Sequence, residues 1–243
     1  MLDYTNLDWI DSSQFEKLSE EIIRENSDKV NWINISIYQK LSEGFIVEFF
    51  DKVNWNCIAK FQKLSERFIR ENSDRVPWGY ISIYQKLSEG FIREYSDKLT
   101  WKSIAKYQKL SPEFIEEYNL EIPETCWLYK DKEFKREYIQ KHTGYEIIGD
   151  KVIAYKSCRG DGYSAFNFQY YYEVGGEYEA HANYNINENG FGLSAWTKEG
   201  ALVYCDAGKL FKVEIDLEDI AAIVFESNKI RARRIKILEE IKF

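Results

Sequence analysis

The chain contains few of the residues that interrupt, cross-link or anchor a protein. Three prolines and thirteen glycines among 243 residues leave little room for flexible linkers. The four cysteines lie far apart without a Cys-x-x-Cys pair, and two histidines are present, so we expect neither disulfides nor a zinc site. No apolar run approaches the roughly 18 residues that a membrane-spanning helix needs, and the N-terminus lacks a signal pattern. These absences predict a cytoplasmic protein that uses no metal or other cofactor and does not enter a membrane.

Positive charge is also scarce relative to negative charge. The chain carries 41 acidic and 33 basic residues, which gives a net charge of −8. Because basic residues drive binding to the phosphate backbone, this balance speaks against direct binding of DNA or RNA. It favours approach to a basic protein surface, and the plainer alternative is that the charge only keeps the protein soluble. A hydrophobic fraction of 44%, with 16% aromatic residues, predicts a packed core rather than disorder.

A period of 23 residues dominates the first half of the chain. Its marker is a tryptophan in every copy: Trp9, Trp32, Trp55, Trp78 and Trp101. The stretch at 38–42 (Tyr-Gln-Lys-Leu-Ser) returns at 61–65, 84–88 and 107–111, and a Phe-Ile pair follows each time. A fixed period of this length is typical of stacked repeat arrays. We therefore predict an α-helical repeat array of five units, which begins at Trp9 and lies within residues 1–123.

Each unit is predicted to be a helical hairpin. Asn31 can cap a helix that begins at Trp32. Trp32 and Tyr38 lie on one apolar stripe along this helix. A serine begins the second helix, as Ser-Pro-Glu at 111–113 indicates most clearly. Helices of about ten residues are unstable alone, so neighbouring units must supply the missing burial. We expect the tryptophans in the core; the alternative is that they are exposed platforms that stack on bases.

Exposed positions of the array repeat as regularly as the core. One row consists of lysines (Lys40, Lys63, Lys86 and Lys109), and a nearby row consists of glutamates (Glu43, Glu66, Glu89 and Glu113). These rows predict either a solvated face or a charged concave surface that grips a partner. Val47 replaces the arginine of its row, and Phe50 stands where other copies carry serine. With Phe49 they form an apolar spot, which is either a partner-binding patch or a locally deeper core.

The period stops near residue 124. Residues 124–144 are predicted to hold an amphipathic helix at 131–141 that caps the array and connects it to the next domain. Residues 145–243 are predicted to form a small α+β domain, with a short helix at 197–204. The predicted strands, rich in branched and aromatic residues, are 151–155, 166–174, 209–215, 221–225 and 229–238. The fold class is therefore α+β: an α-solenoid of short hairpins followed by a domain with a mostly antiparallel sheet.

A loop of the second domain is a candidate binding site. Tyr155, Lys156, Arg159, Asp161 and Tyr163 lead from one strand into a glycine-bearing loop. Loops on rigid scaffolds often carry recognition, and tyrosine and arginine are favoured at interaction hot spots. We predict that these five residues, together with the apolar spot described above, contact a protein partner, and we assign no catalytic residue. The alternative is an ordinary polar loop.

Two sets of motifs resemble known families. The segments at 168–170 (Phe-Gln-Tyr), 173–175 (Glu-Val-Gly) and 192–196 (Gly-Leu-Ser-Ala-Trp) resemble an uncharacterised domain of bacteriophage, prophage and other bacterial proteins. The repeats with Trp, Tyr-Gln-Lys-Leu-Ser and Phe-Ile-Arg-Glu look like arrays of phage, large-virus and bacterial proteins. The resemblance implies a location in the bacterial host cell and transfers no activity. Relatives of the domain read Gly-Phe-His where this chain has Gly192, Leu193 and Ser194.

These observations predict a non-catalytic protein-binding module. The phage resemblance implies a counter-defence inhibitor, similar to anti-CRISPR proteins, that binds a bacterial immune effector such as an RNA-guided nuclease with a basic surface. One alternative is an enzyme similar to ADP-ribosyltransferases, with Tyr155 and Lys156 on an early strand, the segment 192–204, and Glu214 on a late strand. The other alternative is a bacterial scaffold or adaptor protein.

Overall fold

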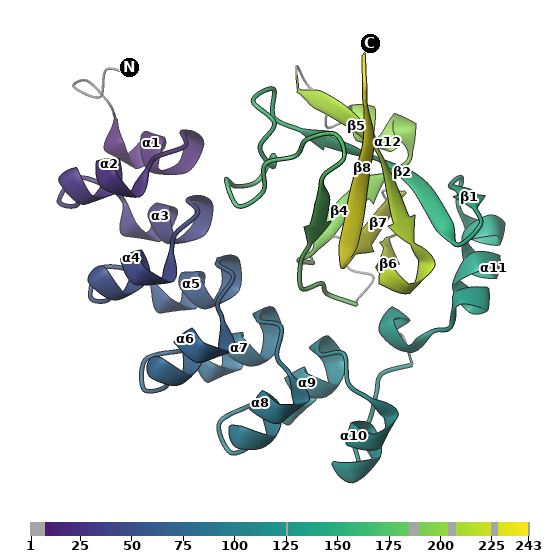
Figure 1. The fold of residues 1–243 in the computed structure, drawn as a ribbon, viewed down its shortest axis with the longest axis horizontal. Helices are drawn as coiled ribbons and strands as arrows, with labels where there is room; N and C mark the ends of the chain where they lie inside the picture. Colours follow the sequence, from purple (N-terminus) through teal and green to yellow (C-terminus); the bar gives the residue numbers. More distant parts are fainter. Residues whose placement is uncertain (1–7, 125, 185–189, 204–207, 225–227, 243) are drawn as a thin grey trace.

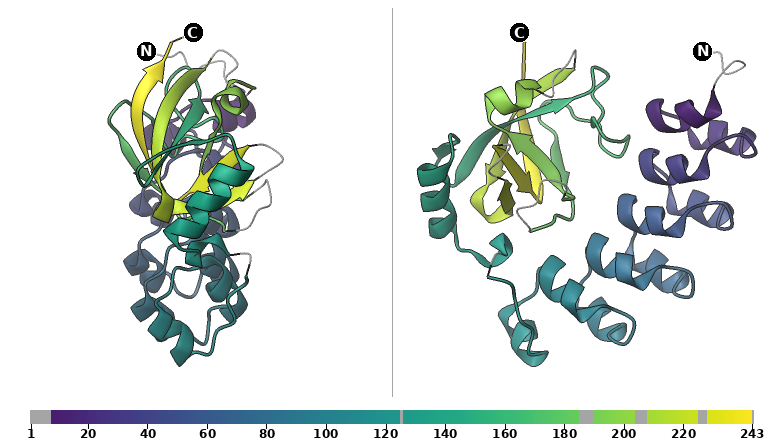
Figure 2. Two further views of the ribbon diagram at one scale, coloured as in Figure 1. Left: turned by 90° about the vertical axis from the view of Figure 1, so that its right-hand side faces the viewer. Right: turned by 180° about the vertical axis from the view of Figure 1, so that it is seen from behind.

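The repeat array curves around the second domain. The computed structural model describes residues 8–124, 126–184, 190–203, 208–224 and 228–242. Figure 1 shows the helical units as an arc, with the β-sheet domain on the concave side of this arc. The two further views in Figure 2 show the same enclosure from the side and from behind. The expected α+β class is confirmed, and the two parts face one another rather than following in a line.

Ten short helices build the described part of the array. The first helix of each unit has seven residues and the second has six, so both are shorter than the expected ten. They are α1 (Trp9–Phe15), α2 (Glu20–Glu25), α3 (Trp32–Tyr38), α4 (Glu43–Glu48), α5 (Trp55–Phe61), α6 (Glu66–Glu71), α7 (Trp78–Tyr84), α8 (Glu89–Glu94), α9 (Trp101–Tyr107) and α10 (Pro112–Glu117). A serine side chain caps each second helix, as expected; Ser111 accepts from the Phe114 N–H ahead of Pro112.

Aliphatic and phenylalanine side chains form the core of the array, and the tryptophans line its edge. Ile35, Phe45 and Ile46 are fully buried in the second unit. The Trp32 ring packs on Phe45, and its indole N–H donates to the Ser27 carbonyl oxygen at 2.9 Å. The five tryptophans are half-buried against the core rather than enclosed in it. Trp55 and Trp78 make the same indole bond to a carbonyl oxygen of the preceding turn, so these three rings connect their units to that turn.

Buried glutamines connect one unit to the next. Gln62 accepts from the Leu41 N–H at 3.1 Å and donates to the carbonyl oxygens of Ser36 and Gln39. The same three bonds recur at Gln39, Gln85 and Gln108. Because each amide satisfies three buried backbone groups, this ladder fixes the spacing of the units.

A tyrosine ends the glutamine ladder. The Tyr129 hydroxyl accepts from the Leu110 N–H at 3.2 Å and donates to the Gln108 carbonyl oxygen at 3.1 Å. Tyr129 belongs to η1 (Trp127–Tyr129), which is followed by α11 (Lys132–His142). The predicted connecting helix is therefore present, and η1 caps the last unit. None of the helices in the described residues combines the length and apolar composition needed to cross a bilayer.

The second domain is built on one antiparallel sheet. Its strand order is β3-β8-β5-β2-β4-β7-β6, and β1 pairs with β2. The strands are β1 (Glu146–Ile148), β2 (Lys151–Cys158), β3 (Glu177–Glu179), β4 (Leu193–Trp196), β5 (Lys209–Asp216), β6 (Ile220–Val224), β7 (Lys229–Ala232) and β8 (Arg234–Ile241); α12 (Lys198–Val203) and η2 (Leu217–Asp219) complete the domain. In the central strand β5, Phe211, Val213 and Ile215 alternate into the core. The expected helix at 197–204 is α12, and Tyr204 lies outside the described residues.

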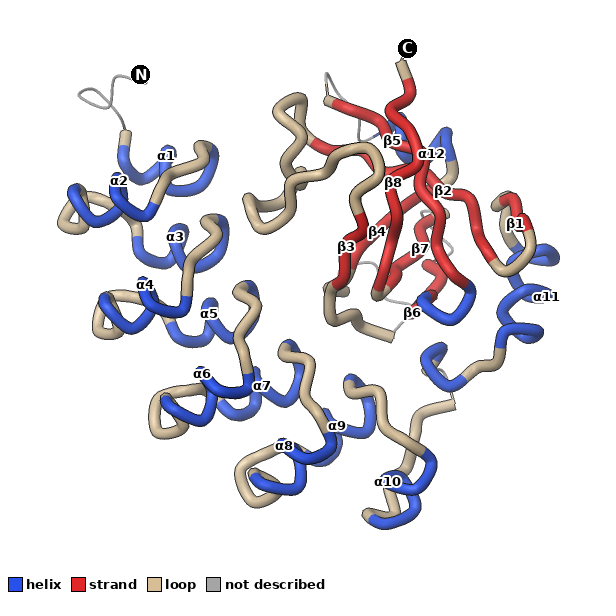
Figure 3. The backbone as a smooth tube through the Cα atoms, viewed as in Figure 1, coloured by secondary structure: helices blue, strands red, loops and turns tan. Residues whose placement is uncertain are grey.

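The strand expected at 166–174 is wrong. Most of this segment is loop, and its one described ladder contact is an isolated bridge between Tyr163 and Tyr171. The whole connection from Arg159 to Gly176 leaves the sheet and extends toward the array, as the tan loop in Figure 3 shows. This departure from the sheet forms one of the contacts between the two parts of the protein.

Candidate functional site on the inner face of the array

The concave side of the array carries one aromatic ring per unit. Each ring stands at the C-terminal end of the first helix, directly before the ladder position: Phe15, Tyr38, Phe61, Tyr84 and Tyr107. The lysine row follows two residues later in each unit. Because the period repeats the geometry of every unit, rings and ammonium groups form two parallel columns on the inner face. Such a surface combines apolar area with polar groups, as protein-recognition surfaces do.

Loops of the second domain insert aromatic rings into this column. Phe166 lies 5.7 Å from Tyr38 and 5.9 Å from Phe61, measured between ring centroids. Farther along the array, Phe191 lies 4.9 Å from Tyr84 and also contacts the ring of the fifth unit. Each inserted ring is thus placed between the rings of two successive units. We call this set of contacts the clasp.

Backbone carbonyls of the array accept hydrogen bonds from the same loops. The Phe168 N–H donates to the Tyr38 carbonyl oxygen at 2.9 Å. The Gln169 side-chain amide donates to the Gln39 carbonyl oxygen, also at 2.9 Å. The last carbonyls of a helix have no partner within it, so the C-terminal ends of the first helices offer acceptors along the inner face.

A histidine and an ion pair extend the clasp toward the fourth unit. His181 Nε2 lies 2.9 Å from the Ile83 carbonyl oxygen, which fits the tautomer that carries its proton on Nε2. Burial, together with the nearby Lys86 ammonium, lowers the pKa of His181 to about 4. Lys86 also donates to Glu179 at 2.6 Å and lowers the pKa of that carboxylate. His181 is therefore neutral at pH 7.

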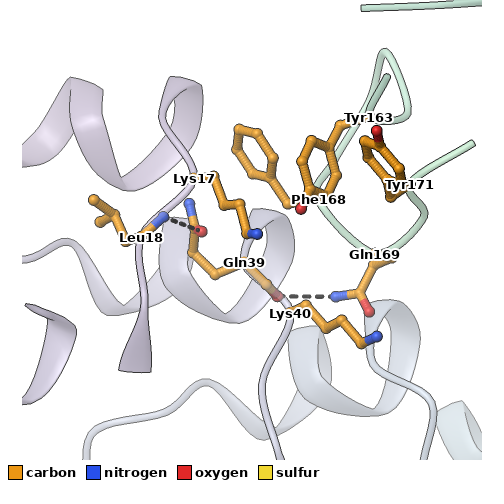
Figure 4. Close-up of a pocket in the computed structure, with 8 residues that line it drawn as sticks. All are labelled: Lys17, Leu18, Gln39, Lys40, Tyr163, Phe168, Gln169 and Tyr171. Atoms are coloured by element: carbon orange, nitrogen blue, oxygen red, sulfur yellow. Dashed lines mark hydrogen bonds between the residues drawn. The ribbon is translucent and has the colours of Figure 1, made fainter. Parts of the chain in front are cut away.

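A small cavity lies where the clasp meets the first two units. It has a volume of about 190 Å³ and is lined by Lys17, Leu18, Gln39, Lys40, Tyr163, Phe168, Gln169 and Tyr171. Figure 4 shows Gln39 and Gln169 joined across it, with three aromatic side chains on the domain side. The Lys17 ammonium lies 4.9 Å from the Tyr163 ring centroid. Rings, amides and ammonium groups suit binding and orientation rather than proton transfer.

Three of the predicted loop residues lie at this contact. Arg159 Nε is 3.2 Å from Asp161 Oδ2, and Asp161 also accepts from the Tyr163 N–H. Arg159 Nη1 donates to the Phe15 carbonyl oxygen of the first unit at 3.2 Å. In this conformation Arg159, Asp161 and Tyr163 therefore hold the protein's own array. Their contact with a separate partner stays a prediction.

Tyr155 and Lys156 lie within the sheet domain instead. Tyr155 packs beside α12, on the face of β2 opposite to Lys156. Lys156 is buried, its ammonium donates to the Ser194 carbonyl oxygen at 2.9 Å, and burial lowers its pKa to about 8. Lys156 therefore faces the sheet core rather than the loop, because strand alternation turns its side chain inward, and its contact with a partner stays a prediction. Glu214 pairs with Ile153 and thus shares the face of Tyr155, not that of Lys156.

Val47 and Phe50 are distant from the loop. Val47 belongs to α4, Phe50 lies in the turn after it, and Figure 1 shows α4 on the side of the array away from the sheet. Both are exposed, at 48% and 45% of their surface, and the Arg75 guanidinium lies 4.7 Å from the Phe50 ring centroid. Phe49 packs on Trp32. The spot therefore consists of two exposed side chains beside a packed third.

Sequence reasoning missed the aromatic column and the two rings that fill it. The apolar stripe predicts a buried Tyr38, whereas the structure places it half-exposed at the helix end. A signal was present: an aromatic residue precedes the glutamine in every copy from Tyr38 onward, whereas the fully buried apolar positions of the same helices are aliphatic: Ile35, Ile58, Ile81 and Ile104. Phe166 and Phe191 carried no comparable signal, because neither belongs to a repeat.

Comparison of the chain with protein-family models, with curated proteins and with solved structures finds no match. Function is therefore inferred from the geometry of the chain itself. Within the parts of the chain that the structure describes, no three His, Cys, Asp or Glu side chains are grouped to hold a metal ion. The inner face of the array and the domain loops against it are the most developed contact surface among the described residues.

Proposed function

We propose that this chain is a non-catalytic protein-binding module that inhibits a bacterial immune effector, such as an RNA-guided nuclease. One observation carries the binding role: the array already holds a polypeptide segment through inserted rings, backbone carbonyls and lysines. Phe166 between Tyr38 and Phe61 is the clearest example. The resemblance of the repeats and of segment 168–196 to phage and prophage proteins motivates the counter-defence role.

The clasp prepares the remaining surface for a partner. It fixes the array against the sheet, so the outer surface loses little conformational entropy when a partner binds. On that surface, several glutamates are neutralised by arginines of the preceding unit, as in the pair of Arg93 with Glu117 at 2.7 Å. Other exposed acids near the end of the array, including Glu113 and Glu116, form no ion pair among the described residues. An acidic surface of this kind suits a basic partner.

An RNA-guided nuclease offers a suitable basic surface. Its channel holds nucleic acid through positively charged residues, and complementary charge increases both association rate and specificity. An acidic, preformed arc that covers this channel would exclude guide or target by competition. The association rate should therefore fall as ionic strength rises.

A plaque assay tests the proposal directly. The full chain is expressed in a strain whose RNA-guided nuclease targets the infecting phage, and in a matched strain without the nuclease. We expect plaque numbers on the defended strain to rise toward those on the undefended strain. The double variant Glu113→Gln with Glu116→Gln should restore less infection. The double variant Glu173→Gln with Glu240→Gln removes equal charge from exposed positions of the sheet domain and should act like the wild type.

The outcomes separate the competing functions. Unchanged plaque numbers, together with unchanged DNA cleavage by the purified nuclease when the chain is added, would reject the inhibitor role. Binding to a host protein without any effect on infection would support a scaffold or adaptor instead. Consumption of NAD by the purified chain, lost on Glu214→Gln, would support the enzymatic alternative.

A further inference from the structure

The turn that ends each of the first four units carries a positively charged residue at one fixed position. The four are Lys29, Lys52, Arg75 and Lys98. Each lies over an aromatic ring of the array, at 4.7–5.9 Å from the ring centroid. Cations are attracted to the faces of aromatic rings, so this arrangement is a repeated cation–π contact. In the fifth unit the same position is Glu121.

The second unit shows how the ammonium group is held. Lys52 Nζ lies 5.7 Å from the ring centroids of both Trp32 and Phe49. It also donates to the backbone carbonyl oxygen and the hydroxyl of Ser27, in the preceding turn, at 3.3 Å each. Lys98 repeats the ring contacts in the fourth unit, over Trp78 and Tyr95. A ring pair and a serine of the preceding turn thus form a site for one ammonium group.

The fifth unit retains this site without its lysine. Trp101 and Tyr118 stack with centroids 4.6 Å apart, compared with 4.8 Å for the pair in the fourth unit. Ser96 stands 23 residues after Ser73 and takes the place of Ser27 in the preceding turn. An open recess of about 600 Å³ lies here, and its lining consists of Ser96, Asp97, Trp101, Tyr118, Asn119 and Leu120. We call it the terminal recess.

The charge around the terminal recess favours a cation. Asp97 lines it, and Glu116 and Glu121 are exposed in α10 and in the turn that follows. In the described residues these three carboxylates form no ion pair. α10 itself has no basic residue in its last turn. A cation that enters would meet ring faces, a carboxylate and the serine of the preceding turn.

We propose that the terminal recess binds a lysine side chain of a partner protein with a basic surface. The partner's ammonium group would take the position over Trp101 and Tyr118 that Lys52 and Lys98 take over their own rings. This inference deepens the proposed function and rests on it for the nature of the partner. The geometry of the recess itself is independent of that function.

Acetylated, amidated hexalysine is the probe for the recess. It is titrated into the full ¹⁵N-labelled chain, and the indole N–H signals are followed by NMR, with Trp101 assigned through Trp101→Phe. We expect the Trp101 signal to shift most, with saturation. Glu121→Lys should supply an internal lysine and weaken the response of Trp101 roughly threefold or more. Glu124→Lys makes the same charge change at an exposed position outside the lining and should respond like the wild type.

Stability gives a second readout that needs no ligand. If Glu121→Lys places an ammonium group over the rings, its midpoint of thermal unfolding should exceed that of Glu124→Lys by about 1–3 °C. An unmoved Trp101 signal, or equal responses of the two lysine variants in both experiments, would overturn the proposal. A selective Trp101 response without any effect on phage infection would retain the recess and reject the proposed function. If the wild type inhibits the nuclease and Glu121→Lys inhibits it equally well, the proposed function would be retained and the role of the recess rejected.

Discussion

At the scale of single residues, ion pairs between units show what one departure from the repeat changes. Arg24 binds Glu48 at 2.7 Å, and equivalent pairs join the third unit to the fourth and the fourth to the fifth. Val47 occupies the arginine position of the second unit. Glu71 occupies the position of the glutamate partner, and it pairs with Arg67 of its own helix at 2.8 Å instead. One inter-unit bond is therefore replaced by a bond within a helix.

Val47→Arg should restore the missing pair with Glu71 and stabilise the array. Exposed ion pairs contribute little individually, so we expect the midpoint of thermal unfolding to rise by about 1–3 °C. Calorimetry at low and high salt measures the effect, which should shrink in high salt because exposed charges are screened. Val47→Gln controls for the loss of an exposed apolar side chain. In a Glu71→Gln background the gain should vanish; a gain that persists there would show another cause.

Single residues also show how far the sequence predicts side-chain positions. The serine caps and the fully buried Ile35 and Phe45 follow directly from local pattern, because helix period alone decides them. The burial of Lys156 does not follow in this way, because strand alternation turns this charged side chain inward. The pairing of strands, which a single sequence does not reveal, decided that position.

At the scale of elements, the glutamine ladder determines how hairpins stack. Gln62→Met fills similar space but leaves the Leu41 N–H and the Ser36 carbonyl oxygen without their partner, whereas the Gln39 carbonyl oxygen keeps its bond from Gln169. Each unsatisfied buried group costs about 1–3 kcal/mol, so we expect the free energy of unfolding to fall by roughly 3 kcal/mol. Urea unfolding followed by circular dichroism measures this loss.

An exposed glutamine provides the matched control for the ladder. Gln140→Met makes the same change on the surface of α11 and should alter the free energy of unfolding by less than about 0.5 kcal/mol. Equal effects of the two substitutions would show that the ladder bonds do not hold the units. The comparison requires that the free energy of unfolding changes with urea concentration at the same slope in both variants, because a changed slope indicates partial unfolding.

Elements were predictable where the pattern repeats and unreliable where it does not. Five copies of one hairpin average out local ambiguity, and all five hairpins are present. The segment 166–174, by contrast, is rich in aromatic residues and so resembles a strand. Its aromatic rings are covered by two different surfaces: Phe166 packs against the array, and Tyr172 packs against the sheet core. The apolar composition indicates that the segment packs against other parts of the protein, but it does not indicate whether the sheet or the array provides the contact.

At the scale of the whole molecule, the clasp joins positions far apart in the chain. His181 contacts the Ile83 carbonyl across 98 residues, and Arg159 reaches Phe15 across 144. Such contacts have no local signal, so the enclosure of the sheet domain by the array was not predictable from one sequence. The charged rows predict either a solvated face or a concave surface that grips a partner, and in this structure the protein's own loops contact the inner face.

The clasp should weaken in mild acid because of His181. Its pKa is about 4 in the folded protein, compared with a value near 6.5 in an unfolded chain. Between these values the unfolded chain binds a proton that the folded protein does not, so the free energy of unfolding falls as pH falls from 6.5 toward 4. From pH 7 to pH 5 the contribution of this group should decrease by roughly 1–2 kcal/mol.

His181→Gln tests this expectation because glutamine can still donate to Ile83 but does not titrate in this range. Urea unfolding at pH 7 and pH 5 should show a smaller loss for this variant than for the wild type, since other groups contribute equally to both. His142→Gln removes the chain's other histidine, on α11, and should retain the wild-type loss. Small-angle scattering of the wild type at pH 5 should show a larger radius if the clasp opens before global unfolding. A loss of stability that is identical in all three proteins would mean that carboxylates, not the buried imidazole between the array and the sheet, control the response to acid.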